Sequence, residues 1–478
     1  MSSKPGSHIK SFRIFTIILS VILLILGLFA ILHYFKFGFG VEESKRDYEE
    51  IIESKKLKVV LATNPIDYFI YQGQPMGFQL EMLESFAKSK GLDLVINIEN
   101  DVQKGLEMLL NRECDILAQG IVNSLSQEAY VNYTLPIRST RLVLVKHVLK
   151  NEDILNLKPD IEDNITLKYI YVGKNQTDTK VLKTYLTEII PNFYLVEIDS
   201  LSNEAIIKNV SEGIFDFAVV DYNIAKISES YWHNIDYSTD VSVDKNISWS
   251  LRPESKQLLD SVNFWLEDFL QSNDYRRLNL NYINNNKILV DLESDFYSIS
   301  TGKISEYDDK IRKYSKLINW DWRLVSSLIY EESRFNPDLV SWAGAYGLMQ
   351  LMPVTFNTFK DPEKSGVDAQ IYAGVKYIEF LDKKFFEQVP KQEDRIYFVL
   401  ASYNIGPGHV EDAIRLAEKY KEDVSSWESV AFYLSNMSNS KYYNDPVVVH
   451  GYYPGIYAVS FAESIVKRYE HYKNIIPK

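Results

Sequence analysis

Glu332 is the residue of this chain whose position most clearly indicates acid chemistry. It ends the stretch WDWRLVSSLIYEE (320–332), whose apolar residues recur at helical spacing. With Leu328 at 0° and about 100° per residue, the apolar stripe is centred near 30° and Glu332 falls near 40°, within it. Ionising a carboxyl group on a buried face is unfavourable, so its pKa rises toward the value that a general acid needs at neutral pH. The competing interpretation is an ordinary helix-end glutamate that pairs with Arg334.

The residues after this helix predict a loop that returns to it. SRFNP (333–337) ends the helix, and AGAYG (343–347) supplies small residues for a close backbone approach. LMQLMP (348–353) then begins a new apolar segment. The sequence therefore predicts a small-residue loop beside the carboxyl group, with room for a ligand.

These segments resemble the lytic transglycosylases of the Slt type, which belong to the goose-lysozyme-like glycosidases. The family's motifs occur in order as ESRFNP (332–337), SWAGAYGLMQLMP (341–353) and ASYNIG (401–406). AGVKYIEFL (373–381) matches the helix that follows the active-site loop in this family. The resemblance covers about residues 303–478 and implies a mainly α, lysozyme-like domain.

The resemblance also implies a substrate and a mechanism. The substrate is the glycan strand of peptidoglycan, cleaved without water at the β-1,4 bond between N-acetylmuramic acid and N-acetylglucosamine. Glu332 protonates the glycosidic oxygen and then accepts the proton of the muramyl C6 hydroxyl, which closes a 1,6-anhydro ring. One carboxyl group suffices because the nucleophile belongs to the substrate. The residues expected to bind or orient the sugars are Ser341, Gly347, Met349, Gln350, Tyr403 and Asn404.

One departure concerns the late Glu-Thr-x-x-Tyr segment of this family. In GYYPGIYAVSFAESI (451–465), Phe461 stands at the tyrosine position and Tyr457 near the glutamate position. Tyr453 and Tyr457 are the candidates to replace the missing hydroxyl group. Because the acid and its loop are intact, we expect an active enzyme.

Two other functions remain open for this domain. A goose-type muramidase would hydrolyse the glycan with a second carboxylate, for which Asp361 and Asp368 are the candidates. A non-catalytic receptor for wall fragments would need neither. Seven histidines without HExxH or paired spacing, and a single cysteine, give no support to a metal centre, and no cofactor is expected.

The middle of the chain alternates predicted strands and helices. LKVVLAT (57–63), LDLVINI (92–98) and CDILAQG (114–120) are predicted strands separated by helical patterns. The alternation recurs between YIYVG (169–173) and FDFAVVD (215–221). Two α/β units in series predict two lobes with a cleft between them, and Cys114 is expected in the core of the first.

The order of these segments resembles the type 3 family of periplasmic solute-binding domains, over about residues 55–285. The family's ligand-binding arginine falls near Gln127, so the group that pairs with a ligand carboxylate is missing. Asp221 matches the family's aspartate and Tyr68 its stacking aromatic, and Asn123 and Ser124 are further candidates to line the cleft. The resemblance implies a small ligand, such as an amino acid or a wall peptide. Alternatively, Asp221 only caps the next helix, and the module binds nothing small.

Residues 14–35 (IFTIILSVILLILGLFAILHYF) predict a transmembrane helix. They carry no formal charge, and a helix of this length rises about 33 Å, against a hydrocarbon core of about 30 Å. A buried core helix and a cleaved signal peptide are the alternatives, although the run is long for a signal peptide and no small-x-small site follows it. Residues 1–13 contain basic residues and no acid, so the positive-inside rule places them in the cytoplasm.

The 478 residues therefore divide into successive parts with different roles. The expected parts are a cytoplasmic tail (1–13), a transmembrane helix (14–35), a spacer (36–55), a two-lobed module (56–285), a linker (286–302) and a helical domain (303–478). With 52 basic and 65 acidic residues, the net charge of −13 disfavours nucleic-acid binding. We expect a protein of the cell envelope, anchored in the membrane, with its catalytic domain in the periplasm.

Overall fold

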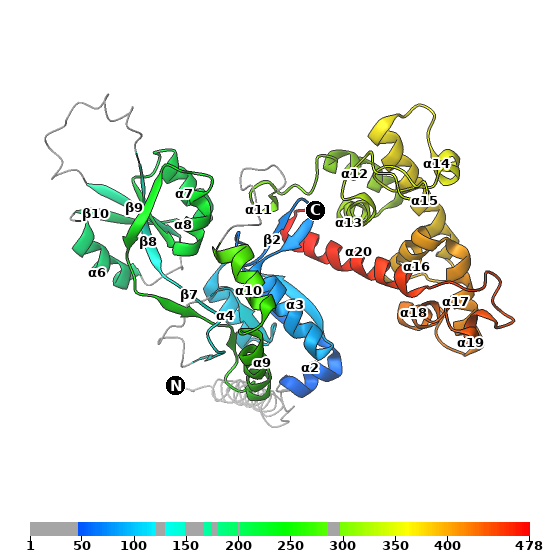
Figure 1. Cartoon of the computed structure of the whole chain (residues 1–478), viewed down its shortest axis with the longest axis horizontal. Helices are drawn as coiled ribbons and strands as arrows, with labels where there is room; N and C mark the ends of the chain where they lie inside the picture. Colours follow the sequence, from blue (N-terminus) through cyan, green and yellow to red (C-terminus); the bar gives the residue numbers. More distant parts are fainter. Residues whose placement is uncertain are drawn as a thin grey trace, which may run out of the picture.

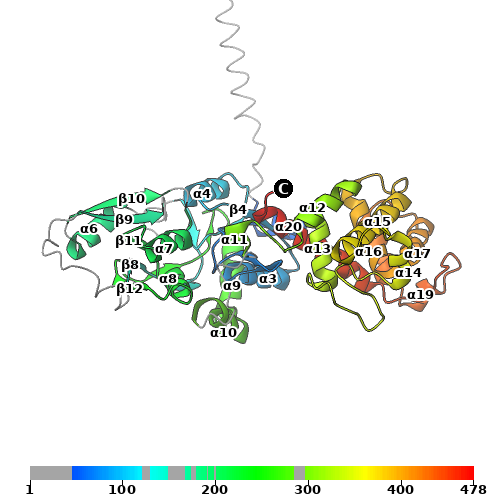
Figure 2. The ribbon, with the colours of Figure 1, turned by 90° about the horizontal axis from the view of Figure 1, so that it is seen from above.

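The structure is a computed structural model, and it describes residues 46–120, 130–148, 167–173, 179–190, 192–198, 201–284 and 297–478. Two α/β lobes precede a helical domain, and Figure 2 shows the three units in a row. The predicted transmembrane helix at residues 14–35 lies outside the described residues. Within the described part of the chain, no helix combines the length and the apolar character needed to cross a membrane.

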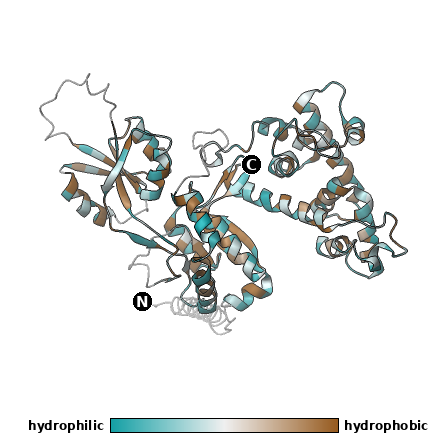
Figure 3. Ribbon diagram, in the orientation of Figure 1, coloured by the Kyte–Doolittle hydropathy of each residue, from teal (hydrophilic) through white to brown (hydrophobic). Residues whose placement is uncertain are grey.

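The first lobe is built on a five-stranded sheet with the order β4-β1-β5-β14-β6. Its strands are β1 (Lys56–Leu61), β4 (Asp93–Ile98), β5 (Ile116–Ala118), β6 (Asn132–Tyr133) and β14 (Ser250–Leu251). β1 pairs in parallel with β4 and β5, and the connections are α3 (Phe78–Lys90) and α4 (Val102–Leu110). These elements confirm the predicted α/β alternation, and hydrophobic residues colour the strands brown in Figure 3.

The second lobe repeats the design with the order β10-β9-β11-β8-β12. Its strands are β8 (Leu142–His147), β9 (Lys168–Gly173), β10 (Phe193–Ile198), β11 (Phe217–Asp221) and β12 (Ile235–Asp240). The helices are α6 (Thr179–Ile189), α7 (Asn203–Ser211) and α8 (Tyr222–Glu229).

Two antiparallel strands, β7 (Arg138–Thr140) and β13 (Lys245–Ile247), connect the lobes. β7 lies in the chain between β6 of the first lobe and β8 of the second, and β13 lies between β12 and β14 (Figure 1). The chain therefore passes to the second lobe and back through this paired connection, as the two-lobed prediction requires. α2 (Tyr48–Ser54), α9 (Lys256–Phe269) and α10 (Asn273–Asn279) complete the module, and Ile51 of α2 is fully buried in its core.

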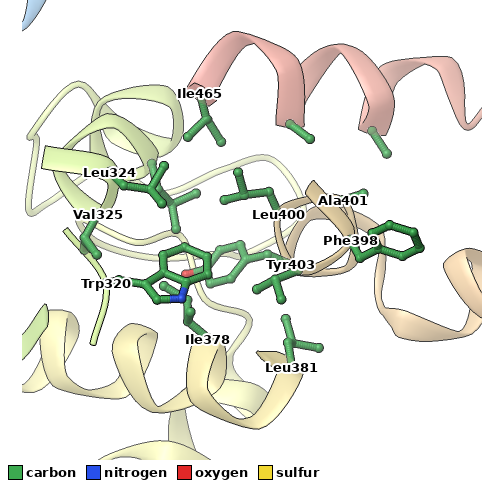
Figure 4. Close-up of a cluster of buried hydrophobic side chains, with 14 of the residues drawn as sticks. Trp320, Leu324, Val325, Ile378, Leu381, Phe398, Leu400, Ala401, Tyr403 and Ile465 are labelled. Carbon is green, nitrogen blue, oxygen red and sulfur yellow. The ribbon is translucent and has the colours of Figure 1, made fainter. Parts of the chain in front are cut away.

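The last unit is helical, as predicted. Its helices are α12 (Asp308–Ser315), α13 (Trp322–Ser333), α14 (Pro353–Phe359), α15 (Gly366–Phe385), α16 (Gln392–Ile405), α17 (Pro407–Lys419), α18 (Trp427–Ser435), α19 (Ser440–Tyr443) and α20 (Ile456–Ile475). The short helix α11 (Ser298–Thr301) precedes them, lies within the predicted linker and packs against β2 (Phe69–Tyr71). α13, α15, α16 and α20 enclose the buried cluster of Figure 4, to which Val325, Ile378, Phe398 and Ile465 contribute. This core holds the carboxyl end of α13 in place.

The helical domain and the first lobe are joined by a packed contact. α20 runs from the helical domain to the hairpin of β2 (Phe69–Tyr71) and β3 (Gln74–Met76), as Figure 1 shows. The Tyr472 hydroxyl donates a hydrogen bond to the carbonyl oxygen of Gly73, at 2.6 Å, and Asn474 donates to the carbonyl of Ile96. Ile70 of this hairpin is part of the core of the helical domain. The hairpin is thereby fixed beside α13.

Candidate active site

Glu332 lies in the last turn of α13. The helix begins at an N-cap, Asp321, whose carboxylate accepts a hydrogen bond from the Arg323 amide at 2.9 Å. It ends at Arg334, which has a left-handed backbone with φ of 51°. The apolar residues expected on one face, Leu324, Val325, Leu328 and Ile329, are all buried, so the predicted stripe is confirmed.

Desolvation of the half-buried Glu332 side chain and, as the smaller cause, the negative charge of Glu331 together raise the pKa of Glu332 to about 8. In the part of the chain that the structure describes, Glu332 and Arg334 form no ion pair, and the Arg334 guanidinium lies 5.8 Å from the centre of the Tyr330 ring instead. Glu331 instead pairs with Arg468 of α20, with 2.7 Å between their nitrogen and oxygen atoms. At pH 7 Glu332 therefore carries a proton that it can donate.

The loop after α13 returns to the helix, as predicted. The Ser333 hydroxyl donates a hydrogen bond to the carbonyl of Leu348, at 2.8 Å. Gln370 of α15 accepts from the Leu348 amide and donates to the carbonyl of Pro337. A Cβ atom on Gly347, where φ is +80°, would lie 2.5 Å from the Gln370 side chain. Gly347 is therefore required both by its backbone conformation and by this close contact.

Met349 and Tyr403 connect this loop to α16. The Tyr403 hydroxyl donates to the carbonyl of Met349, at 2.7 Å. Burial raises the pKa of Tyr403, and the nearby negative charge of ionised Glu332 raises it as the second cause. The two side chains are therefore close enough to interact electrostatically. The Met349 side chain is fully buried against Gly374 of α15 and packs in the core instead of lining a cleft.

The remaining predicted sugar-binding residues lie on the loop or at its edge. The side-chain amide of Gln350 donates hydrogen bonds to the backbone carbonyls of Leu339 and Gly347, at 2.9 and 2.8 Å. The Ser341 hydroxyl accepts from the Ala345 amide, and Asn404 is exposed at the end of α16. Gln350 and Ser341 thus stabilise the loop backbone, and sugar binding by these residues stays a prediction.

Among the described residues, neither of the two tyrosines proposed to replace the family's missing one, Tyr453 and Tyr457, is hydrogen-bonded to Glu332. Phe461 is half-buried against the core of the helical domain. Tyr457 is exposed, and the ring of Tyr453 lies 4.7 Å from that of His409. The proposed replacement of the hydroxyl by Tyr453 or Tyr457 stays a prediction.

The two carboxylates considered as a second acid are held by lysines. Asp361 forms an ion pair with Lys364, and Asp368 pairs with Lys310 and accepts a hydrogen bond from the Tyr314 hydroxyl, at 2.8 Å. Hydrogen bonds from these lysines hold the pKa of each aspartate below its usual value. Both side chains have the character of structural ion pairs.

In the two-lobed module, Tyr68 and Asp221 make contacts that stabilise the fold. The ring of Tyr68 is fully buried and its hydroxyl lies 3.0 Å from Nδ1 of His471, so it contacts α20 and leaves no face for a ligand to stack on. Asp221 caps α8 by accepting from the Asn223 amide, and it accepts from the Thr140 hydroxyl, each with its own carboxylate oxygen.

Asn123 and Ser124, which were predicted to line the cleft, lie outside the described residues, as does Gln127, near which the family's arginine is missing. Cys114 is buried in the core of the first lobe, as expected, and burial raises the pKa of its thiol to about 12.

A pocket of about 290 Å³ lies between the β2–β3 hairpin and the end of α13. Its walls include Tyr71, Gln74, Tyr330, Arg334 and Phe335. Tyr330 of α13 and Arg334, the residue that follows the helix, both line it, and the Arg334 guanidinium lies 5.8 Å from the centre of the Tyr330 ring, whereas Glu332 is not part of its walls. The pocket is therefore distinct from the surface that carries the acid.

Comparisons with known proteins agree with this arrangement. Residues 57–285 match the family of bacterial extracellular solute-binding proteins, family 3, and residues 309–426 match the transglycosylase SLT domain.

The chain joins a family 3 solute-binding domain to a transglycosylase SLT domain.

It is similar to proteins named membrane-bound lytic murein transglycosylase F. One from Desulfosudis oleivorans is 26% identical over 435 residues, which cover 90% of this chain and 93% of that protein. Another, from Pseudomonas putida strain W619, is 26% identical and covers 90% of this chain and 87% of its own length. The predicted order of an N-terminal membrane segment, a type 3 solute-binding module and an Slt-type domain indicates a membrane-bound lytic murein transglycosylase F-like protein, and the comparisons confirm this resemblance.

Proposed function

We propose that this chain is a lytic transglycosylase that cleaves the bond between N-acetylmuramic acid and N-acetylglucosamine in peptidoglycan and leaves 1,6-anhydromuramyl ends. Glu332 carries the proposal, because its pKa of about 8 keeps the proton on an acid at the end of α13. Its domain matches the transglycosylase SLT domain, and similar proteins along about 90% of the chain are named for this activity.

The burial of Glu332 serves both halves of the reaction. In the first half, the protonated carboxyl group gives its proton to the glycosidic oxygen as the bond to C1 breaks. In the second, the resulting carboxylate accepts the proton of the C6 hydroxyl, whose oxygen forms the new bond to C1. A desolvated carboxylate is a strong base, so the environment that retains the proton also favours its recovery.

A hydrolase is the less favoured function. It needs a second carboxylate to activate water, and both candidates, Asp361 and Asp368, are paired with lysines. No such partner is needed when the nucleophile is the C6 hydroxyl of the substrate.

The full-length protein in detergent, added to purified sacculi, tests this function. We expect wild-type protein to release soluble muropeptides and E332Q to release none, because glutamine has no proton of comparable acidity. Equal behaviour of the two proteins, with no release from either, would favour the receptor for wall fragments.

Two further parts of the proposal concern the rest of the chain. We propose that residues 14–35 anchor the protein in the membrane and that its catalytic domain lies in the periplasm, which the name of the relatives supports. Retention of the protein in the membrane pellet after alkaline extraction tests the anchor. We also propose that the module binds an amino acid or wall peptide near Asn123, Ser124 and Asp221, and calorimetry with these ligands tests it.

A further inference from the structure

Trp342 is fully exposed at the tip of an ordered turn. Its exposed fraction is 101%, whereas the other six tryptophans, all within the described residues, are buried or half-buried. The turn is held by hydrogen bonds from the Gly344 amide to the Ser341 carbonyl and from the Ser341 amide to the Ala345 carbonyl, each at 2.9 Å. Ser341 Oγ also accepts from the Ala345 amide, at 3.0 Å. The exposure of the indole is therefore not the result of a loosely held backbone.

Other large apolar side chains near Trp342 in the sequence are exposed as well. We define the apolar rim as Val340, Trp342, Tyr346, Met352 and Val354. Val340 and Tyr346, on either side of the 341–345 turn, pair in an antiparallel β-bridge, and Tyr346 forms a second antiparallel β-bridge with Leu351. Val340 is 61% and Val354 80% exposed. A concentration of exposed apolar side chains on ordered backbone is typical of a binding surface.

The turn that carries the apolar rim is joined by hydrogen bonds to the loop beside Glu332. At the base of this turn, the Gly347 amide donates a hydrogen bond to the Leu339 carbonyl, at 2.9 Å. The carbonyl of the next residue, Leu348, accepts a hydrogen bond from the hydroxyl of Ser333, which is adjacent to Glu332 in the chain. Gly344, in the turn that carries Trp342, is three positions from Gly347, so the two lie at most about 10 Å apart at about 3.3 Å per residue. A strand bound across Glu332 can therefore reach the tip within a short run of sugars.

We propose that the apolar rim is an accessory saccharide subsite, in which the indole of Trp342 stacks on an N-acetylhexosamine ring of the strand being cleaved. This proposal rests on the proposed function. The C–H groups on one face of a pyranose ring carry small positive charges and pack favourably on the negative face of an aromatic ring. The N-acetyl methyl group supplies apolar surface for Val340 and Tyr346. Because this contact lies away from the scissile bond, it strengthens substrate binding without taking part in the chemistry.

Kinetics with full-length protein in detergent separate an effect on substrate binding from an effect on the chemical step. On sacculi, we expect W342A to raise KM about tenfold with kcat within about twofold of wild type, because an aromatic contact is lost equally from ground and transition states. W342F keeps an aromatic ring and should retain most of the affinity. The matched control is F264A, since Phe264 is an exposed aromatic (68%) on α9 of the other domain, and its KM should not change. An unchanged KM in W342A overturns the proposal.

Tryptophan fluorescence provides a second readout that does not need turnover. We expect a hexamer of N-acetylglucosamine to protect part of the emission of E332Q from iodide quenching, and the protection to be absent in E332Q/W342F. Equal protection of both proteins overturns the proposal. So does a loss of binding of W342A to anionic phospholipid vesicles with an unchanged KM, which would make the rim a membrane surface. If wild type releases no product while the protection is present, the proposed function fails and the saccharide subsite stands.

Discussion

The neighbours of Glu332 predict how the pH dependence of the enzyme responds to mutation. Catalysis requires protonated Glu332, so kcat/KM should fall as pH rises through its pKa of about 8. E331Q removes the negative charge that raises this pKa and leaves Arg468 without its partner. The basic limb of the profile should therefore move to lower pH. R468M has the opposite effect, because it leaves the charge of Glu331 uncompensated.

The size of both shifts follows from simple electrostatics. For a generic separation of about 7 Å, two like unit charges repel by about 2 kcal/mol at an effective dielectric constant of about 20. Arg468, at 2.7 Å from Glu331, offsets much of this repulsion. We expect the midpoint of the basic limb to move about one pH unit lower in E331Q and about half to one pH unit higher in R468M, since one pKa unit corresponds to about 1.4 kcal/mol.

The assay is kcat/KM on soluble glycan strands between pH 5 and pH 10, for the wild type and each variant. E387Q is the matched control, because it changes the net charge as E331Q does but lies at an exposed position after α15. Its limb should coincide with that of wild type. Movement of the E331Q and R468M limbs in the same direction, or no movement of either, would refute the assignment of this limb to Glu332.

Three other predictions concern stability. Since the folded pKa of Glu332 lies above its unfolded value of 4.5, the folded carboxylate is penalised as pH rises from about 4.5 to 8. E332Q should therefore unfold at higher urea concentration at pH 7, with a gain of at most about 3 kcal/mol that disappears at pH 4. G374A places a Cβ atom in steric overlap with the sulfur of Met349, and should lose activity and about 1–3 kcal/mol of stability in thermal unfolding, part of which M349A restores. Y472F removes the hydrogen bond to Gly73 and should cost about 1 kcal/mol in urea unfolding, with faster proteolysis of the β2–β3 hairpin.

The regular elements were accessible from the sequence because their patterns are local. The run that begins at Leu57 predicts β1, and the alternation of strands and helices predicts both lobes. The connecting strands β7 and β13 are three residues long, too short for a period to be recognised. The contact of α20 with the first lobe joins residues about 400 positions apart, such as Tyr472 and Gly73, and no local pattern encodes it. This contact also explains why Tyr68 is buried.

At the site, the helical wheel was sufficient to place Glu332 among buried residues. It could not identify Arg468 or Gln370, because each reaches the site from another helix far along the chain. No sequence pattern marked Gly374 as a residue of the site. Its close contact with the Met349 side chain, which leaves no room for a Cβ atom, explains why this position is a glycine. The sequence predicted Met349 as a cleft residue because its motif was known, whereas packing turned its side chain into the core.

Mass spectrometry of the products formed in ¹⁸O-labelled water tests the central claim most directly. If the C6 hydroxyl of the substrate is the nucleophile and Glu332 the acid and base, wild type should release muropeptides with 1,6-anhydro ends and no ¹⁸O at C1, and E332Q should release none. Reducing ends labelled with ¹⁸O would show that water attacks C1, and would contradict the account.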